Sequence, residues 1–219
     1  MIASVLYSII MIIVSPIGDE ISASQAETKI DFVLVLLQCI FGVLCMLLPK
    51  YLERKLNILF PPVMLIMYSI FLFCAAILGE FGNFFYIFPL WDDILHAFSC
   101  GVLTIIGFSV FHLLKHSNTV SQDLNPLLIA MFAFSFTVVL GVVWEVYEYI
   151  FDGLLGINMQ KFILADGTVL SGRAALTDTM HDLIVNGASS LAVTVFGYLS
   201  LKYKKGWIEK LLLVRKKDN

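Results

Sequence analysis

The sequence predicts an all-α protein, a polytopic membrane helix bundle with about six transmembrane helices. Hydrophobic residues make up 59% of the 219-residue chain and charged residues only 14%, whereas a soluble domain is about half apolar and about a quarter charged. The mean hydropathy is +0.91. We expect one transmembrane helical domain over residues 1–201 and a basic amphipathic cytoplasmic tail over residues 202–219, where apolar residues stand among lysines.

Six segments approach the roughly 20 apolar residues that a membrane-spanning helix needs. They cover residues 2–17, 31–48, 58–79, 92–114, 126–149 and 178–201. The first is the shortest, and Ser24-Gln25-Ala26 after it has the look of a signal-peptidase site. No basic residue precedes this segment, so we expect a retained helix. Asn125-Pro126 predicts the start of the fifth helix, because the missing N–H of proline does no harm in a first turn.

The lysines and arginines predict the orientation, because cytoplasmic loops are enriched in both. Eleven of the 14 basic residues fall in loops 49–57 and 115–125 or in the tail, and only Lys29, Lys161 and Arg173 fall on the other side. Both termini are then cytoplasmic. Nothing in the basic residues suggests nucleic-acid binding, and the oligomeric state stays open. The four cysteines lie in apolar segments without a CxxC pair, so we interpret them as core residues.

The acidic residues show the opposite asymmetry, since 13 of the 17 fall on or near the outer side. Three apolar segments carry ionisable groups at their outer ends, although a charge inside a bilayer costs several kcal/mol or more. Residues three or four apart lie on one face of a helix, and a rise of about 1.5 Å per residue puts groups of all three helices at matching depths. We therefore expect one shared pocket. Its members are Asp92, Asp93 and His96; Glu145, Glu148 and Asp152; Asp178, His181, Asp182 and Asn186.

A pocket with this many carboxylates needs compensating positive charge, and Arg173 is the nearest arginine. Proton sharing or a bound metal then has to neutralise it. Carboxylate and imidazole ligands suit zinc, manganese or iron, and also magnesium where waters complete the shell. The predicted ligands of such a divalent metal are His96, Glu145, Glu148, Asp178 and Asp182, with Asp93, His181 and Asn186 as further site residues.

Several of these residues also have simpler interpretations. The simpler roles are helix-dipole partner for Asp92 and Asp93, N-cap for Asp178, surface carboxylate for Asp152 and core histidine for His96. Glu145 and Asp182 are the hardest to explain in this way, because both should lie inside the apolar zone.

At these motifs the chain resembles the YjdF-like bacterial inner-membrane proteins, a family of unknown function. The motifs are DDILH (92–96), WEVYEY (144–149) and DTMHD (178–182), and the resemblance covers about residues 58–200. More distantly, an Asp-x-x-x-His start, a later glutamate and the string from Asp182 to Gly187 resemble VanZ-like membrane proteins. The chain departs from the YjdF-like pattern at Tyr149, where that pattern has tryptophan. The resemblance implies a bacterial cytoplasmic membrane and supplies no reaction.

Three functions are compatible with these residues. The first is a metal-dependent hydrolase of a lipid or lipid-linked envelope substrate, with membrane lipids as partners and Glu145 or Glu148 as the base. The second is a cation or proton-coupled transporter, and the third is a non-catalytic accessory protein with a structural metal. The inner halves of segments 92–114, 126–149 and 178–201 are interpreted as apolar, which favours a one-sided site over a path across the membrane.

Overall fold

The computed structural model describes residues 9–10, 12–14, 29–82, 84–116, 124–164 and 166–216, and the predicted all-α class is confirmed. Its long helices are α2 (Lys29–Leu56), α3 (Pro62–Leu72), α5 (Trp91–His116), α6 (Pro126–Leu155) and α7 (Arg173–Lys202). A π-helical segment, η1 (Phe73–Phe81), continues α3, and the short helix α4 (Phe84–Ile87) leads into α5. The remaining elements are β1 (Ile58–Leu59), the 3₁₀ turn η2 (Glu209–Leu211) and β2 (Val214–Arg215).

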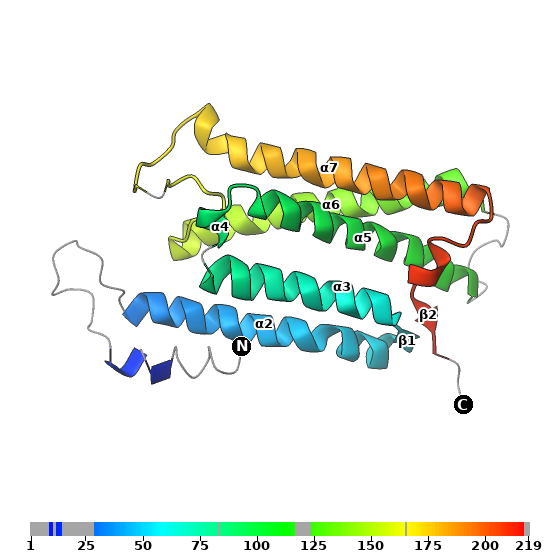
Figure 1. Ribbon diagram of the computed structural model, residues 1–219, viewed down its shortest axis with the longest axis horizontal. Helices are drawn as coiled ribbons and strands as arrows, with labels where there is room; N and C mark the ends of the chain where they lie inside the picture. The colour runs from blue at the N-terminus through cyan, green and yellow to red at the C-terminus, as the bar shows by residue number, and fades with distance from the viewer. Residues whose placement is uncertain are drawn as a thin grey trace.

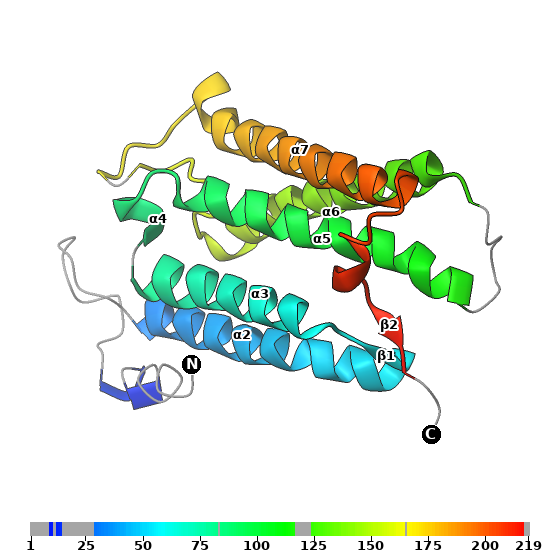
Figure 2. The same ribbon diagram turned by 45° about the vertical axis from the view of Figure 1, so that its right-hand side comes forward.

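Helices α5, α6 and α7 pack against one another and form a three-helix core, with α2 and α3 side by side next to it (Figures 1 and 2). At one end of the molecule, β1 pairs antiparallel with β2, so that Ile58 opposes Arg215. Short helix α4 and the loop 156–172 lie at the opposite end (Figure 1). The two ends of the core therefore differ, and the ionisable residues are found at the α4 end.

Four helical segments are long and apolar enough to cross a membrane: Pro62–Gly79, Trp91–Lys115, Pro126–Leu155 and Arg173–Lys202. They coincide with the predicted segments 58–79, 92–114, 126–149 and 178–201. The predicted segment 31–48 lies within α2, and most of the predicted segment 2–17 lies outside the described residues.

Helix α6 exposes apolar residues and buries a face that turns from apolar to acidic along its length. It exposes Val139 and Val143 to 59% and 56%, which suits contact with lipid. Its buried side is a stripe with a spacing of three or four residues, the spacing of one helix face. That stripe begins with apolar residues and ends with acids: Ile129, Ala130, Ala133, Thr137, Gly141, Glu145, Glu148 and Asp152.

Glycines allow close contacts between the elements of the core. A Cβ atom added to Gly107 on α5 would lie 2.8 Å from the Cα atom of Ala133 on α6. On α7, a Cβ atom added to Gly197 would lie 2.5 Å from the Phe108 ring and 2.7 Å from Ile208. Small residues permit such approach in membrane bundles, and here they fix how α6 and α7 present their buried faces to α5.

The helix ends confirm one prediction and correct another. Helix α6 begins as predicted, since the side chain of Asn125 accepts the N–H of Leu127 at 2.9 Å and Pro126 is the first helical residue. Helix α7 begins at Arg173, after Gly172 with φ 57°. Asp178 therefore lies inside the helix and is not its N-cap. The residues before the predicted segment 178–201 are already helical, because α7 extends beyond the apolar residues that define that segment.

The C-terminal segment, predicted as a basic amphipathic tail, packs in part against the bundle. Over residues 203–216 the chain forms η2 and β2, and Ile208, Leu212 and Leu213 are buried in the core cluster that includes Phe108. These apolar side chains pack into the protein, and the pairing of β2 with β1 follows them in the chain. The boundary between domain and tail stays a prediction.

Candidate metal centre

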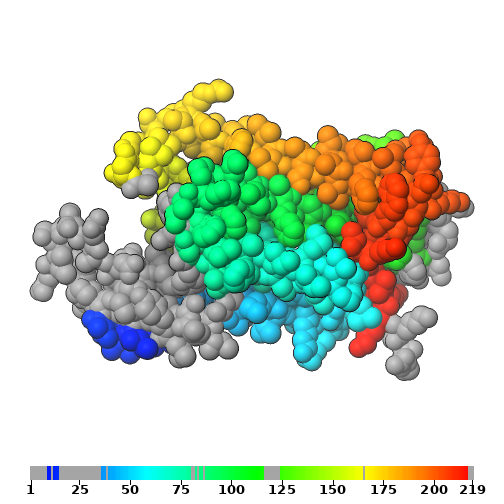
Figure 3. Space-filling model, in the orientation of Figure 1, coloured from blue at the N-terminus to red at the C-terminus, as the bar shows by residue number. Residues whose placement is uncertain are grey.

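The ionisable side chains that the sequence places in one pocket lie together where α5 and α7 begin and α6 ends (Figure 1). We refer to them as the acid cluster. Loop 156–172 lies beside them, and Figure 3 shows its yellow residues against the green beginning of α5. The acid cluster comprises Asp92, Asp93, His96, Glu145, Glu148, Asp178, His181 and Asp182.

His96 lies in the middle of the acid cluster and is 7% exposed. Its Nδ1 atom is 3.2 Å from Oδ1 of Asn186 and 4.0 Å from Oε1 of Glu145. Its Nε2 atom is 3.8 Å from Oδ1 of Asp92 and 3.9 Å from Oδ2 of Asp182. An amide oxygen only accepts hydrogen bonds, so Nδ1 carries the hydrogen and the neutral ring has its lone pair on Nε2. A metal-binding histidine is oriented by a hydrogen bond of this kind on its other nitrogen.

Asn186 packs closely between α5 and α6. Its Oδ1 atom also accepts a hydrogen bond from Sγ of Cys100 at 3.0 Å, from α5. On the α6 side, a Cβ atom added to Gly141 would lie 3.2 Å from Nδ2 of Asn186. The amide belongs to α7, and it is 3% exposed. Asn186 therefore fixes the orientation of His96 from a position that has little freedom to move.

Glu145 and Asp182 carry buried oxygen atoms that have no hydrogen-bond partner among the described residues. These atoms are both oxygens of Glu145 and Oδ2 of Asp182, in residues that are 4% and 1% exposed. Burying an ionised carboxylate without a partner is expensive, because its solvation is lost and nothing replaces it. The two side chains therefore require a proton or a cation that the polypeptide does not supply.

Glu148 completes the inner part of the acid cluster. Its Oε1 atom accepts a hydrogen bond from Nε1 of Trp144 at 2.9 Å, one turn earlier on α6. One carboxylate oxygen from each of Glu145, Glu148 and Asp182 lies within 4.8 Å of the others. Three oxygens from two helices at this spacing form a group that could hold a divalent cation.

Two further groups of three side chains have donor atoms within 4.8 Å of one another, and Asp182 belongs to all three groups. In the outermost group, Nδ1 of His181 is 2.9 Å from Oδ1 of Asp93, and the side chain of His181 is 57% exposed. His181 and Asp93 are thus partners of each other at the surface. The two further groups are Asp92, His96 and Asp182, and Asp93, His181 and Asp182.

Asp178 and Asp92 face a lysine from the neighbouring loop. Nζ of Lys161 forms an ion pair with Oδ2 of Asp92 and lies 3.8 Å from Oδ1 of Asp178. Burial by itself lowers the pKa of Lys161, but the charge and hydrogen bond of Asp92, with Asp178 and Asp182 behind it, outweigh this effect and raise the pKa above 10.5. Lys161 is therefore an ammonium ion at neutral pH, and Asp178 belongs to its surroundings more than to the inner group.

Asp152 is not the surface carboxylate that one interpretation expects. It is 7% exposed, and its two oxygens accept the backbone N–H groups of Met159 at 2.8 Å and Gln160 at 2.9 Å. Asp152 lies one turn after Glu148 on α6, and its side chain anchors the loop that follows this helix. Its role is therefore to hold the loop.

Three residues of the centre have no role there in the sequence prediction: Lys161, Cys100 and Trp144. Lys161 has a weak signal, since it is one of three basic residues on the acidic side of the protein. Trp144 stands four residues before Glu148, a spacing at which side chains meet on a helix. Cys100 continues the face of Asp92 and His96 at the same spacing, but a buried cysteine is more often an apolar core residue.

The core between the two ends is more polar than the sequence suggests. The interpretation of the inner helix halves as apolar is wrong, because a row of hydroxyl groups is buried there. Most of these hydroxyls bond to a carbonyl one turn earlier, as in Thr104 to Cys100 at 2.8 Å and Ser190 to Asn186 at 2.6 Å. The buried hydroxyl residues are Thr104, Ser109, Thr137, Ser190, Thr194 and Ser200.

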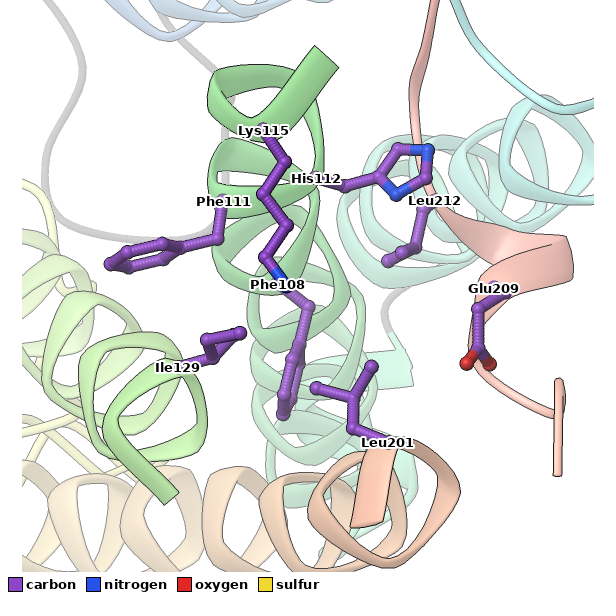
Figure 4. A pocket seen from close by; sticks show the side chains of 8 residues that line it. All are labelled: Phe108, Phe111, His112, Lys115, Ile129, Leu201, Glu209 and Leu212. Atoms are coloured by element: carbon purple, nitrogen blue, oxygen red, sulfur yellow. The ribbon is translucent and has the colours of Figure 1, made fainter. Parts of the chain in front are cut away.

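A small cavity of about 70 Å³ lies at the opposite end of the core from the acid cluster. Figure 4 shows Phe108, Ile129 and Leu201 converging on it from α5, α6 and α7, with the carboxylate of Glu209 to one side. Its lining is largely apolar, so it offers no chemistry comparable to that of the acid cluster.

The comparisons with known proteins support the assignment of this chain as a membrane protein. The model of a family described as "Predicted membrane protein (DUF2238)" matches residues 3–203. The chain belongs to this family. An uncharacterized protein of Thermotoga maritima is 30% identical over 134 residues, which is 60% of this chain and 60% of that protein. The matched region thus spans less than two thirds of the relative. No solved structure matches the chain, and the YjdF-like and VanZ-like resemblance stays a prediction.

Proposed function

We propose that this protein is a metal-dependent hydrolase of the membrane, which binds a divalent ion through Glu145, Glu148, Asp182 and His96. The observation that carries the proposal is the buried carboxylate of Glu145. Neither of its oxygens has a hydrogen-bond partner among the described residues, and it faces Asp182 and Glu148 within 4.8 Å. Like charges at this spacing are stable only with a cation or a proton between them.

The donor set narrows the identity of the ion. Three carboxylates and one imidazole suit manganese, iron or zinc, whereas magnesium prefers oxygen ligands and several waters. A bound ion of this kind supplies an activated water at neutral pH. Of the two glutamates, Glu148 already accepts a hydrogen bond from Trp144. Glu145 is therefore the better candidate for the base that takes a proton from water.

The position of the centre favours a lipid or a lipid-linked envelope molecule as the substrate. The last turns of α6, next to Glu148 and Asp152, expose Tyr149 to 69% and Leu154 to 74%. Large apolar side chains exposed at the end of a membrane span suit contact with acyl chains. The proposal includes six spans, both termini in the cytoplasm and a bacterial cytoplasmic membrane, with the acid cluster on the outer side.

Metal binding is tested first, on full-length protein purified in detergent and loaded separately with manganese, iron and zinc. We expect bound metal after gel filtration in the wild type and in Asp166→Asn, because the side chain of Asp166 is exposed in the loop and accepts the N–H of Thr168 in the same turn. Glu145→Gln and Asp182→Asn should lose it. Wild-type protein that holds none of the three ions overturns the proposed centre.

Hydrolysis is tested next, on the same proteins reconstituted with total lipid extract from the source organism. Mass spectrometry should detect free fatty acids or headgroups that accumulate with metal-loaded wild type and not with Glu145→Gln. Metal binding without any metal-dependent lipid product overturns the hydrolase and leaves a metal-binding accessory protein.

The row of buried hydroxyls supports a transporter as the second candidate. Oγ1 of Thr104 lies 3.1 Å from Oγ1 of Thr137 in the middle of the core, and Oγ1 of Thr194 has no partner among the described residues. Manganese uptake into proteoliposomes that contain a fluorescent chelator tests this function. Uptake by the wild type that disappears in Thr194→Val would favour the transporter over the hydrolase.

A further inference from the structure

The loop after α6 holds one of its residues in an unfavourable backbone conformation. Lys161 has φ 48°, in the left-handed region that side-chain-bearing residues seldom adopt. Such a conformation persists only where surrounding contacts enforce it, and it is typically found at functional positions. The structure around Lys161 shows what enforces it.

Hydrogen bonds hold the loop on both sides of Lys161. Asp152 accepts the N–H groups of the two preceding residues, Met159 and Gln160. Asn158 closes the turn around Lys161, because its Nδ2 donates to the carbonyl of Ile163 at 2.8 Å and its Oδ1 accepts the N–H of Ile163 at 2.9 Å. The turn from Asn158 to Ile163 is therefore fixed, with Lys161 inside it.

The loop is also tied to α7 and to α4. The side chain of Gln160 donates to Oγ1 of Thr179 at 2.9 Å, and Nζ of Lys161 lies 5.7 Å from the centre of the Phe85 ring, within the range of a cation–π contact. These contacts direct the ammonium group to Asp92 and Asp178. Its side chain is only 28% exposed.

The ammonium group and one of the candidate metal groups compete for the same carboxylate. Oδ1 of Asp92 faces Nε2 of His96, and together with Asp182 these side chains form a candidate metal group. Oδ2 of Asp92 pairs with Lys161. A divalent ion in this group would lie close to a fixed positive charge in a buried site, where repulsion is poorly screened. The inner group of Glu145, Glu148 and Asp182 shares no ion pair with Lys161 among the described residues.

We propose that Lys161 is a built-in cation that takes the place of a second metal ion beside Asp92 and Asp178, so that the acid cluster binds one divalent ion, held by the inner group together with His96. This inference rests on the proposed metal centre and specifies how many ions it takes. Lys161 acts through Asp92 and Asp178 and is a positioning residue. Asp178, whose Oδ2 atom is buried without a partner among the described residues, is available as a ligand once the ammonium is removed.

The number of bound ions per chain tests the inference, with manganese as the probe. Wild type, Lys161→Met and Lys161→Arg are purified at full length in detergent, and manganese is measured by equilibrium dialysis with elemental analysis. We expect one ion in the wild type, two in Lys161→Met and one in Lys161→Arg, because arginine restores the charge. Thermal unfolding of each variant shows that it is folded before its ions are counted.

A second variant separates the inner ion from the ion that Lys161 excludes. Lys161→Met combined with Asp92→Asn should return to one ion, because the group vacated by the ammonium loses a ligand. Two ions in the wild type, or one ion in folded Lys161→Met, would overturn the inference and leave the proposed metal centre intact. No ion in any of these proteins would overturn both.

Discussion

Asp152 on α6 accepts the backbone N–H of Gln160 at 2.9 Å, and the residue that follows Gln160 is the lysine that pairs with Asp92. A carboxylate at the end of one helix thereby positions a cation over the beginning of another. The contact spans eight residues of sequence and is almost fully buried on the Asp152 side, at 7% exposed.

We predict that Asp152→Ala releases loop 156–172 and destabilises the protein. The change removes two hydrogen bonds from backbone N–H groups to a buried carboxyl group, each worth about 2 kcal/mol, and leaves these N–H groups without an acceptor. Thermal unfolding in detergent and limited proteolysis should both show it. Asp166→Ala is the control in the same loop, because Asp166 accepts the N–H of Thr168 within an exposed turn. Equal protease resistance of Asp152→Ala and wild type would contradict this role.

The helices of the core could be predicted because their apolar periods and end signals are local properties of the sequence. Asn125-Pro126 located the start of α6 to the residue. The beginning of α7 lies before the predicted segment, because its first turns are polar and precede the apolar residues. Gly172 therefore occupies the N-cap position that one interpretation assigns to Asp178.

The acid cluster was predictable in part for a similar reason. The rise per residue of a helix fixes depth, so His96, Glu148 and Asp182 could be placed at one level without knowledge of the fold. Which neighbours each side chain meets depends on helix rotation and on loops, and these are tertiary properties. The position of Lys161 depends on hydrogen bonds to Asp152 and Asn158, which no local pattern indicates.

Gly107→Leu should disrupt the core, because even a Cβ atom at this position would lie 2.8 Å from the Cα atom of Ala133. Backbone atoms cannot move aside, so α5 and α6 must separate at a cost of about 1–3 kcal/mol or more. Thermal unfolding measures the effect. The matched control is Gly153→Leu on α6, where an added Cβ atom meets nothing within 4 Å. If both variants unfold at the same temperature, close approach of α5 and α6 does not stabilise the bundle.

Reporter fusions should place the two ends of α5–α7 on opposite sides of the membrane. A periplasm-active reporter fused after Lys161 and a cytoplasm-active reporter fused after Lys115 should both give signal, because the basic residues concentrate on the Lys115 side. The exchanged fusions should be silent. One span, α6, separates the two positions. Signal from the same reporter at both positions would contradict this topology.

The contact between Lys161 and Asp92 should stabilise the protein up to alkaline pH. The pKa of Lys161 is raised in the folded protein above 10.5, so its contribution is fully present below 10.5 and is lost as pH rises through the folded value. Thermal unfolding of wild type and Lys161→Met, followed from neutral pH upward, isolates this contribution. The difference between the two proteins should be constant at neutral pH and shrink above 10.5. A difference that shrinks on acidification from neutral pH towards 6 would assign the effect to another group.

Removal of the hydrogen bond to His96 should weaken metal binding without removing any ligand. Asn186→Leu leaves Nδ1 of His96 without its acceptor at 3.2 Å, so the ring loses the contact that keeps the lone pair on Nε2. Loss of such an orienting partner typically costs about 10- to 100-fold in metal affinity. Competition with a chelator of known affinity measures this change at fixed pH, because protons compete with metal for the ligands.

Asn186→Asp keeps an acceptor for Nδ1 and should retain more of the affinity than Asn186→Leu. Leu191→Ala, at a position of α7 that is 53% exposed, is the control. If Asn186→Leu binds metal as tightly as that control, His96 is not a ligand whose orientation matters.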